Sequence, residues 1–205
     1  MTQFDEADVT ELEVFRKEQN MEQGHPFIKL TPLAFLIKAS VTALIKHPQF
    51  NSSIQESLEN LILKKFYNIG IAVETEGGLV VPVLKDADKK GLLQIAEESA
   101  ALAAKARNKA LSFEDMQGAT FTISSLGGIG GTAFTPIVNS PEVAILGVSK
   151  SNKQQIFIKD EFKVRTILPI SLSYDHRVID GAEGARFCVH LSKSLGKDFA
   201  FKLAV

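Results

Sequence analysis

The segment that decides the fold reads VRTILPISLSYD over residues 164–175 and continues directly into HRVIDGAEG over residues 176–184. Its first part is almost continuously apolar and rich in β-branched residues, which predicts a buried strand. Its second part brings His176 and Asp180, then a glycine and a predicted helix over residues 181–195. Ionisable groups at the end of a buried strand cost free energy unless they have partners or a task. This junction is therefore the first candidate for a functional site.

Outward from this strand, the chain alternates between helical and extended patterns. Apolar residues spaced three and four apart predict helices over residues 6–23, within 29–50, and over 91–111. The second helix is expected to begin with Thr31 as N-cap and Pro32 at its first position. The β-rich runs that predict strands are residues 61–75, 77–86, 118–126, 142–150, 154–160 and 163–175. The first two runs are expected to form a hairpin that turns at Gly77 and Gly78. Short turns join the late strands, which predicts an α+β fold: a two-layer sandwich with a mixed, largely antiparallel sheet covered by helices.

The composition predicts one globular domain over residues 1–205. The chain is 45% hydrophobic with a formal net charge of -1 and has no basic patch, so we expect no nucleic-acid partner. No apolar run approaches the roughly 20 residues that a membrane span needs, so we expect no membrane partner either. The single cysteine, Cys188, excludes an intrachain disulfide and favours a reducing compartment.

A glycine-rich stretch, GGIGGTA over residues 127–133, follows a predicted strand. Gly128, Gly130 and Ala133 have the spacing of a dinucleotide-binding turn, which requires a helix to follow it. The next residues, FTPIVNSPEVAIL, contain two prolines and no helical period. We therefore favour a loop whose backbone approaches a ligand closely. A tight structural loop and a dinucleotide site remain the alternatives.

The four-residue spacing of His176 and Asp180 allows three interpretations. On a helix, two such side chains could bind a metal, but no third ligand lies nearby in the sequence, so we expect none. The structural interpretation is a histidine paired with a carboxylate at a strand end. The functional interpretation is a general base, because an imidazole takes up and releases a proton near neutral pH.

Ser124 and Ser125 end the strand that precedes the glycine-rich stretch. A lone serine in this position is usually a turn residue. The flanking sequence TISSL lacks the G-x-S-x-G pattern of an activated serine nucleophile. Ser124 is better suited to donate a hydrogen bond to a developing oxyanion, because a strand end fixes its position without activating it.

With these motifs together, the chain resembles the catalytic core of the dihydrolipoamide acyltransferase component of 2-oxo acid dehydrogenase complexes. The resemblance covers nearly the whole chain and rests, in order, on FDEADVTELEVFRK, LTPLAFLIKA, LVVPVLKDAD, FTISSLGGIGGTAFTPIVNSPEVAILGVSK and LPISLSYDHRVIDGA. The D-H-R-x-x-D-G signature is specific, and Ser124 lies 52 residues before His176. The serines of FTISSLGG are similar to the pyruvate branch, which transfers acetyl groups.

This resemblance implies a fold of the chloramphenicol acetyltransferase type and a homotrimer. It implies acetyl transfer between a dihydrolipoyl thiol and coenzyme A by direct attack of one thiol. In that reaction His176 would deprotonate the attacking thiol, Asp180 would maintain the geometry around it, and Ser124 would donate to the tetrahedral oxyanion.

The same resemblance implies the surroundings of the substrates. Phe134, beyond the glycine loop, is expected at the wall around the lipoyl arm. Arg16 and Leu146 are expected near coenzyme A, or acetyl-CoA. The implied partners are a lipoyl domain as substrate and the decarboxylase and dihydrolipoamide dehydrogenase components of the complex. The implied location is the bacterial cytoplasm or the mitochondrial matrix.

Two stretches depart from the family pattern. The family carries an arm and a strand ahead of TQFDEAD, and an apolar tail where this chain has GKDFAFKLAV. We therefore expect a catalytic core without the arm, lipoyl domain and subunit-binding domain, and a trimer whose assembly into a larger cage stays open.

Two other functions remain as alternatives. A catalytically idle core scaffold would be expected to lose His176, Asp180 or Ser124, and all three are present. An acetyltransferase for a hydroxyl acceptor typically has His-His where this chain has Asp175 and His176.

Overall fold

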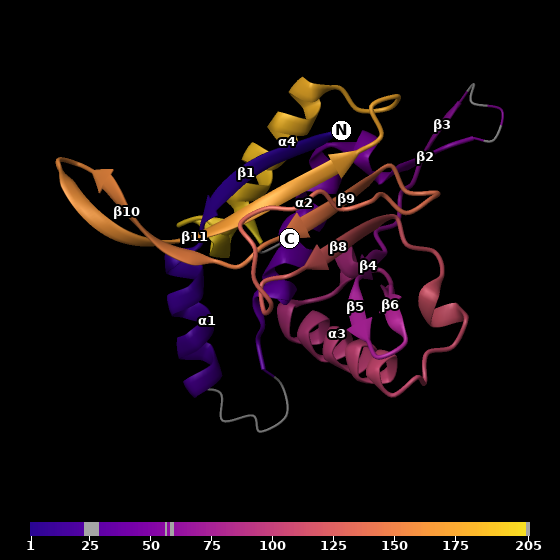
Figure 1. The fold of residues 1–205 in the computed structure, drawn as a ribbon, viewed down its shortest axis with the longest axis horizontal. Coiled ribbons are helices and arrows are strands. Elements are labelled where there is room, and N and C mark those ends of the chain that lie inside the picture. Colours follow the sequence, from indigo (N-terminus) through magenta and orange to yellow (C-terminus); the bar gives the residue numbers. More distant parts are fainter. Residues whose placement is uncertain (23–28, 56, 58–59, 204–205) are drawn as a thin grey trace.

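The structure is a computed structural model that describes residues 1–22, 29–55, 57 and 60–203. Its central element is a seven-stranded mixed sheet (Figure 1). Its strands are β1 (Thr2–Asp8), β4 (Ile69–Ile71), β7 (Val83–Leu84), β8 (Phe121–Ser125), β9 (Ala144–Val148), β10 (Asn152–Ile158) and β11 (Glu161–Tyr174). Their order is β1-β11-β9-β8-β4-β7, with β10 paired to β11. Only β4–β8 and β8–β9 are parallel among these pairs, so the largely antiparallel sheet is confirmed.

Helices and two small hairpins complete the fold. The helices are α1 (Thr10–Glu22), α2 (Pro32–Lys46), α3 (Leu92–Arg107), α4 (Gly181–Leu195) and α5 (Phe199–Lys202), with short 3-10 turns at Pro48–Asn51, Ala87–Lys89 and Glu114–Met116. The hairpins are β2 (Ser52–Ile54) with β3 (Leu61–Leu63), and β5 (Val73–Thr75) with β6 (Gly78–Val80). The second hairpin confirms the turn predicted at the paired glycines, where Gly78 has a φ of 114°.

The N-terminal prediction was wrong in its boundary. Residues 2–8 form the strand β1, which pairs with β11. The helix that we expected to begin at residue 6 begins at Thr10. Residue 23, the expected last residue of this helix, lies outside the described residues. The mostly polar sequence TQFDEAD concealed an edge strand. Asp8 separates the two elements, because its carboxylate accepts the backbone N–H and the hydroxyl of Thr10. Thr31 stands at the N-cap of α2 as expected, although its side chain makes no capping hydrogen bond.

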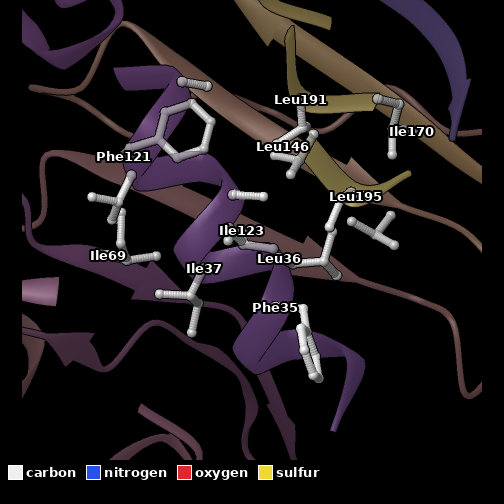
Figure 2. Close-up of a cluster of buried hydrophobic side chains, with 14 of the residues drawn as sticks. Phe35, Leu36, Ile37, Ile69, Phe121, Ile123, Leu146, Ile170, Leu191 and Leu195 are labelled. Atoms are coloured by element: carbon white, nitrogen blue, oxygen red, sulfur yellow. The ribbon is translucent and has the colours of Figure 1, made fainter. Parts of the chain in front are cut away.

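The core lies between one face of the sheet and helices α2 and α4 (Figure 2). Side chains alternate between faces along a strand, so Ile123, its partner Leu146, and Leu172 all point to the helices. It follows that Ser124 and its partner Gly147 face the opposite side of the sheet.

The junction of β11 with α4 depends on a glycine. Tyr174, at the last position of β11, is 2% exposed beneath α4. A Cβ at Gly184 would lie 2.8 Å from the Tyr174 ring, so only glycine allows the helix to pack this closely. The sequence GAEG therefore fixes how the chain turns after the strand.

Candidate active site

The turn that carries His176 continues from the carboxyl end of β11. The N–H of Asp175 donates to the carbonyl of Val143 at 2.8 Å, which keeps the chain beside the start of β9. The Asp175 carbonyl then accepts the N–H groups of Val178 and Ile179, closing the turn. His176 is exposed at this turn, and its ring centroid lies 6.1 Å from that of Tyr174. The imidazole is therefore free to reach a substrate.

Charged partners order the residues on both sides of His176. Arg177 binds the carboxylate of Asp175, with Nη2 at 2.6 Å from Oδ2, and this hydrogen bond lowers the pKa of Asp175. Asp180 accepts the N–H of Glu183 at 2.8 Å and thereby caps the N-terminus of α4. Asp180 thus acts on the turn and the helix, and its bond goes to backbone.

A pocket of about 530 Å³ opens beside this turn. It is lined by Tyr174, Asp175 and Arg177, by Ile54 and Gln55, and by residues 137–138 and 140–143. Among the described residues, no three His, Cys, Asp or Glu side chains gather in a way that could hold a metal. The pocket is thus lined by the residues on either side of His176 and by a partly apolar wall, and His176 itself is not among its lining residues.

Ser124 lies in β8, one residue before that strand ends, and is partly exposed. Its partner in β9 is Gly147, and the Phe134 ring lies over this glycine, with Cζ 2.8 Å from where a Cβ would be. The absence of a side chain at residue 147 thus admits Phe134 next to Ser124. The structure brings these two predicted residues together.

The glycine stretch forms a turn directly after β8. The N–H groups of Ile129 and Gly130 donate to the carbonyl of Leu126, and Gly131 has a φ of 85°. No helix follows this turn before β9. The dinucleotide alternative is therefore wrong, because a pyrophosphate would meet no helix N-terminus here.

The serine and the histidine lie at opposite ends of the sheet. β8 runs parallel to β9, and β9 runs antiparallel to β11, so the arrows of β8 and β11 point in opposite directions (Figure 1). Across the sheet, Ser124 pairs with Gly147 of β9, and Gly147 pairs with Ser171 of β11. Tyr174 lies three residues further along β11. At about 3.3 Å per residue and about 4.8 Å per strand, Ser124 and Tyr174 are separated by roughly 10 Å in each direction. Asp175 pairs with Val143 still further away.

Two other predicted residues lie apart from these ends. Arg16 is on α1, where its guanidinium binds Glu13 and donates to the carbonyl of Leu30. Leu146 is 0% exposed and its side chain packs in the core, so that side chain is turned away from a ligand; the place of Leu146 near coenzyme A stays a prediction (Figure 2). The sheet alternation turns Leu146 inward and leaves Gly147 at the surface that a ligand could reach.

Sequence reasoning missed Glu142. Its side chain is 8% exposed, it lines the pocket beside His176, and its Oε1 accepts the hydroxyl of Thr122 at 2.9 Å. Burial raises the pKa of Glu142 to about 7. The available signal was a lone acid between Pro141 and the apolar run of β9.

The described helices include none that is long and apolar enough to cross a bilayer. The thiol of Cys188 is buried in α4, and burial raises its pKa to about 12.

Comparison with known proteins shows the family to which the chain belongs. Residues 1–200 match the model for the 2-oxoacid dehydrogenases acyltransferase catalytic domain. The dihydrolipoyllysine-residue acetyltransferase component of the pyruvate dehydrogenase complex from Haemophilus influenzae is 56% identical over 197 residues, which are 95% of this chain and 35% of that protein. The chain thus spans about a third of the length of this relative.

Solved structures agree with this assignment. Azotobacter vinelandii dihydrolipoamide acetyltransferase superposes with a TM-score of 0.95 at 54% identity, covering 98% of this chain and 82% of that one. The cubic core of a pyruvate dehydrogenase multienzyme complex gives 0.94 at 55% identity, with the same coverage. A chloramphenicol acetyltransferase gives 0.62 at 13% identity, over 95% of this chain and 87% of that one, which confirms the fold type alone.

The Azotobacter structure was used to investigate a serine, a histidine and an asparagine in the catalytic mechanism of that enzyme. Their separations in that sequence equal those of Ser124, His176 and Asp180 in this one, 52 residues and then four. The third position differs, since this chain has an aspartate there.

Proposed function

The chain belongs to the acyltransferase family of the 2-oxo acid dehydrogenases, and on this basis we propose that it transfers an acetyl group between a dihydrolipoyl thiol and coenzyme A. The proposed unit is one catalytic core domain over residues 1–205. The acetyl preference follows the names of its relatives, which are acetyltransferase components of pyruvate dehydrogenase complexes.

The observation that carries the proposal is the position of Ser124 and His176 at opposite ends of the sheet. A base and an oxyanion donor must each lie about 3 Å from the reacting atoms, so they cannot be separated by more than 10 Å in a working site. Both side chains are nevertheless accessible at their own end. We infer that the complete site forms between subunits, with the histidine from one and the serine from its neighbour.

The proposed chemistry needs a base and no protein nucleophile. A free thiol has a pKa near 8.5 and is mostly protonated at pH 7, so His176 would remove its proton as sulfur attacks the thioester carbonyl. The thioester C–S bond then breaks, and the proton held by His176 passes to the departing sulfur. Both substrates supply their own sulfur atom.

Ser124 would stabilise the tetrahedral intermediate by donating a hydrogen bond from its hydroxyl to the oxyanion. Its fixed place in β8, beside Gly147, suits this role because the donor requires no reorganisation during the reaction. The Phe134 ring and the glycine turn form an apolar and backbone wall on the same side, which we assign to the lipoyl arm. Asp180 would hold the base in place indirectly, through the cap of α4.

The coenzyme A side is less defined by side chains. Arg16 is the cation that we propose near coenzyme A, although its guanidinium is already bound to Glu13 and to the carbonyl of Leu30. Replacing these contacts with a phosphate would require α1 to release the side chain. The side chain of Leu146 has no part in this proposal because it is buried.

Assembly into a ring is supported by two exposed apolar projections on opposite sides of the molecule (Figure 1). One is the β10–β11 hairpin, where Phe157 and Phe162 are 60% and 71% exposed. The other is the β2–β3 hairpin, whose strand Leu61–Leu63 is exposed along its length. A cyclic assembly uses two different surfaces of each subunit, as this arrangement provides.

We propose a homotrimer that belongs to a multienzyme complex, as the relative with a cubic core does. Its partners would be a lipoyl domain, which carries the acetyl group, and the decarboxylase and dihydrolipoamide dehydrogenase components. The relatives that we compared are bacterial, which favours a bacterial complex over a mitochondrial one.

A mixing experiment tests both the activity and the shared site. His176→Ala and Ser124→Ala proteins would be unfolded, mixed in equal amounts, refolded together, and assayed for acetyl transfer from acetyl-CoA to free dihydrolipoamide. In a random ring, each interface has an intact histidine half the time and an intact serine half the time. About a quarter of wild-type activity should therefore return.

The controls are each variant refolded alone, which should stay inactive, and wild-type protein taken through the same procedure. If wild type transfers no acetyl group, the chain is an idle scaffold. If wild type is active but mixed rings, verified by mass spectrometry, remain inactive, both groups come from one subunit and the shared site is wrong.

A further inference from the structure

Glu142 lies at the histidine end of the sheet, and its side chain contacts β8, the strand that carries Ser124. It stands two residues before β9 begins, and it lines both the pocket beside His176 and a neighbouring pocket of about 420 Å³. Its Oε1 is bound by Thr122, whereas its Oε2 is buried without a hydrogen-bond partner among the described residues. Lys64 lines the second pocket, and its positive charge favours the ionised form of Glu142.

One contact of Glu142 reaches the serine strand. Thr122 precedes Ser124 by two residues in β8, so the two hydroxyls lie on the same face of the sheet. The Thr122 hydroxyl has room because its neighbour in β4 is a glycine: a Cβ at Gly70 would lie 2.6 Å from Thr122 Oγ1. The arrangement of a glycine, a threonine and a buried acid is thus built for this hydrogen bond.

The other contact of Glu142 runs through the backbone to the histidine turn. The next residue, Val143, accepts the N–H of Asp175 at 2.8 Å, and Asp175 is the first residue of the turn that carries His176. The Glu142 N–H donates to the carbonyl of Asn139 at 2.8 Å, which holds the acid in place from its other side. A displacement of Glu142 would therefore move the anchor of the turn.

Stability alone does not account for this acid. A buried carboxyl with an unpaired oxygen costs free energy, and an apolar residue of similar volume would be at least as favourable in such a place. The groups that face it are Thr122 from β8, Lys64 from the segment after β3, and Asp175 and Arg177 across the pocket. The link between β8 and the turn is what an apolar residue could not supply.

We propose that Glu142 is a positioning residue for acetyl transfer, which holds the start of β9 against β8 through Thr122 and so fixes the turn that presents His176. The proposal rests on the proposed function of the chain. Because β8 also carries Ser124, the same hydrogen bond sets the two half-sites of one subunit relative to each other.

Four variants test the role by kinetics. Thr122→Val removes the donor and keeps the shape, and Glu142→Ala removes the acceptor. Each should lower kcat roughly 10- to 100-fold with KM within about twofold, because small misplacements of a catalytic group act on the chemical step. Glu142→Gln keeps an oxygen that accepts from Thr122 and should retain at least about a third of wild-type kcat. Ser99→Ala is the matched control: it removes another buried hydrogen bond, to Ala96 in α3, away from both half-sites.

An activity-independent measurement accompanies the kinetics. In Thr122→Val, amide exchange of Asp175 and the rest of its turn should speed up by about tenfold or more, with α3 unchanged. Unchanged exchange at the turn overturns the proposal, as does a loss of kcat in Ser99→Ala equal to that in Thr122→Val. If wild type transfers no acetyl group, the proposed function fails, and the exchange rates still decide whether the Thr122–Glu142 bond holds the turn.

Discussion

The histidine end and the serine end of the sheet are held in place by different kinds of interaction. Around His176, charged side chains bind one another and the backbone: Asp175 holds Arg177, and Asp180 caps α4. Around Ser124, the neighbours are Gly147, the Phe134 ring and a glycine turn closed by backbone hydrogen bonds. A loop that presents a base has to be fastened by side chains. A hydroxyl in a strand is already fixed by the ladder of the sheet.

This difference predicts how each end will fail when it is altered. Substitutions at the histidine end should act through lost charge, lost caps or lost proton transfer. Substitutions at the serine end should act through lost oxyanion contact or through steric displacement of Phe134. The following changes test the two halves against each other, beginning with the largest effect.

Removal of the base should cause the largest loss of kcat. His176→Ala should lower kcat by roughly 10²- to 10⁴-fold, the usual range for loss of a general base, while substrate binding changes far less. Steady-state acetyl transfer with both substrates varied measures this. A variant that keeps half its activity would show that another group takes the thiol proton.

Removing the oxyanion donor should cost somewhat less. Ser124→Ala should reduce kcat by roughly 10²- to 10³-fold with little change in KM, because the hydrogen bond strengthens only in the transition state. Mass spectrometry of the wild-type protein after incubation with acetyl-CoA provides a second measurement. An acetyl group found covalently on Ser124 would show that direct transfer between thiols is wrong.

The buried carboxyl of Glu142, at the histidine end, should make stability depend on pH. Burial raises the pKa of Glu142 to about 7 from its ordinary value of 4.5, so the folded state holds a proton that the unfolded state releases between these values. Stability is therefore lost as pH rises from about 4.5 through 7, by about 3 kcal/mol. Urea unfolding of wild type and Glu142→Gln at pH 4.5 and pH 8, at one protein concentration, should show this loss only in wild type. Parallel pH dependence in the two proteins would contradict it.

Replacing one glycine by alanine at each end compares how tightly the two ends are packed. Gly184→Ala drives a Cβ against the buried Tyr174 ring at 2.8 Å and should destabilise the fold by about 1–3 kcal/mol. Gly147→Ala meets the partly exposed Phe134 ring, which can yield, so the stability loss should be smaller and KM for dihydrolipoamide should rise. Denaturation midpoints and KM values together separate the two outcomes. Equal destabilisation by both changes would mean that the serine end is packed as rigidly as the histidine end.

The smallest expected effect concerns Asp180, where two substitutions separate its charge from its capping hydrogen bond. Asp180→Ala removes the cap of α4 and should cost about 1 kcal/mol of stability, whereas Asp180→Asn keeps an oxygen that accepts the Glu183 N–H. Asparagine should therefore lower kcat only a few-fold, in keeping with the asparagine of the Azotobacter enzyme. Should Asn and Ala prove equally damaging to kcat, the charge of Asp180, and not its cap, would be what the reaction needs.

Much of the fold could be predicted because local pattern and tertiary environment agree. The apolar run of β11, the Pro32 start of α2 and the glycine turn before β6 each depend on residues next to one another in the chain. The strand β1 could not be predicted in this way. It lies along the edge of β11, and its mostly polar residues give no period that distinguishes it from a loop.

The site was predictable in its residue types and less so in its geometry. His176 and Ser124 are recognisable from their motifs, but nothing near them in the sequence shows that their strands run in opposite directions. Leu146 and Gly147 are adjacent, and only the pairing of β9 with β8 decides which of them faces the ligand side. Glu142 was missed because its partner Thr122 lies 20 residues away in the sequence.

The opposite placement of Ser124 and His176 has a consequence that can be counted. If a site exists only where two subunits meet, a single subunit has none, and an open row of n subunits has n − 1. Closing the row into a ring adds one more site without adding a subunit. Activity per chain would therefore show whether the subunits have closed into a ring. Ring closure would raise the activity of the complex without any additional subunit.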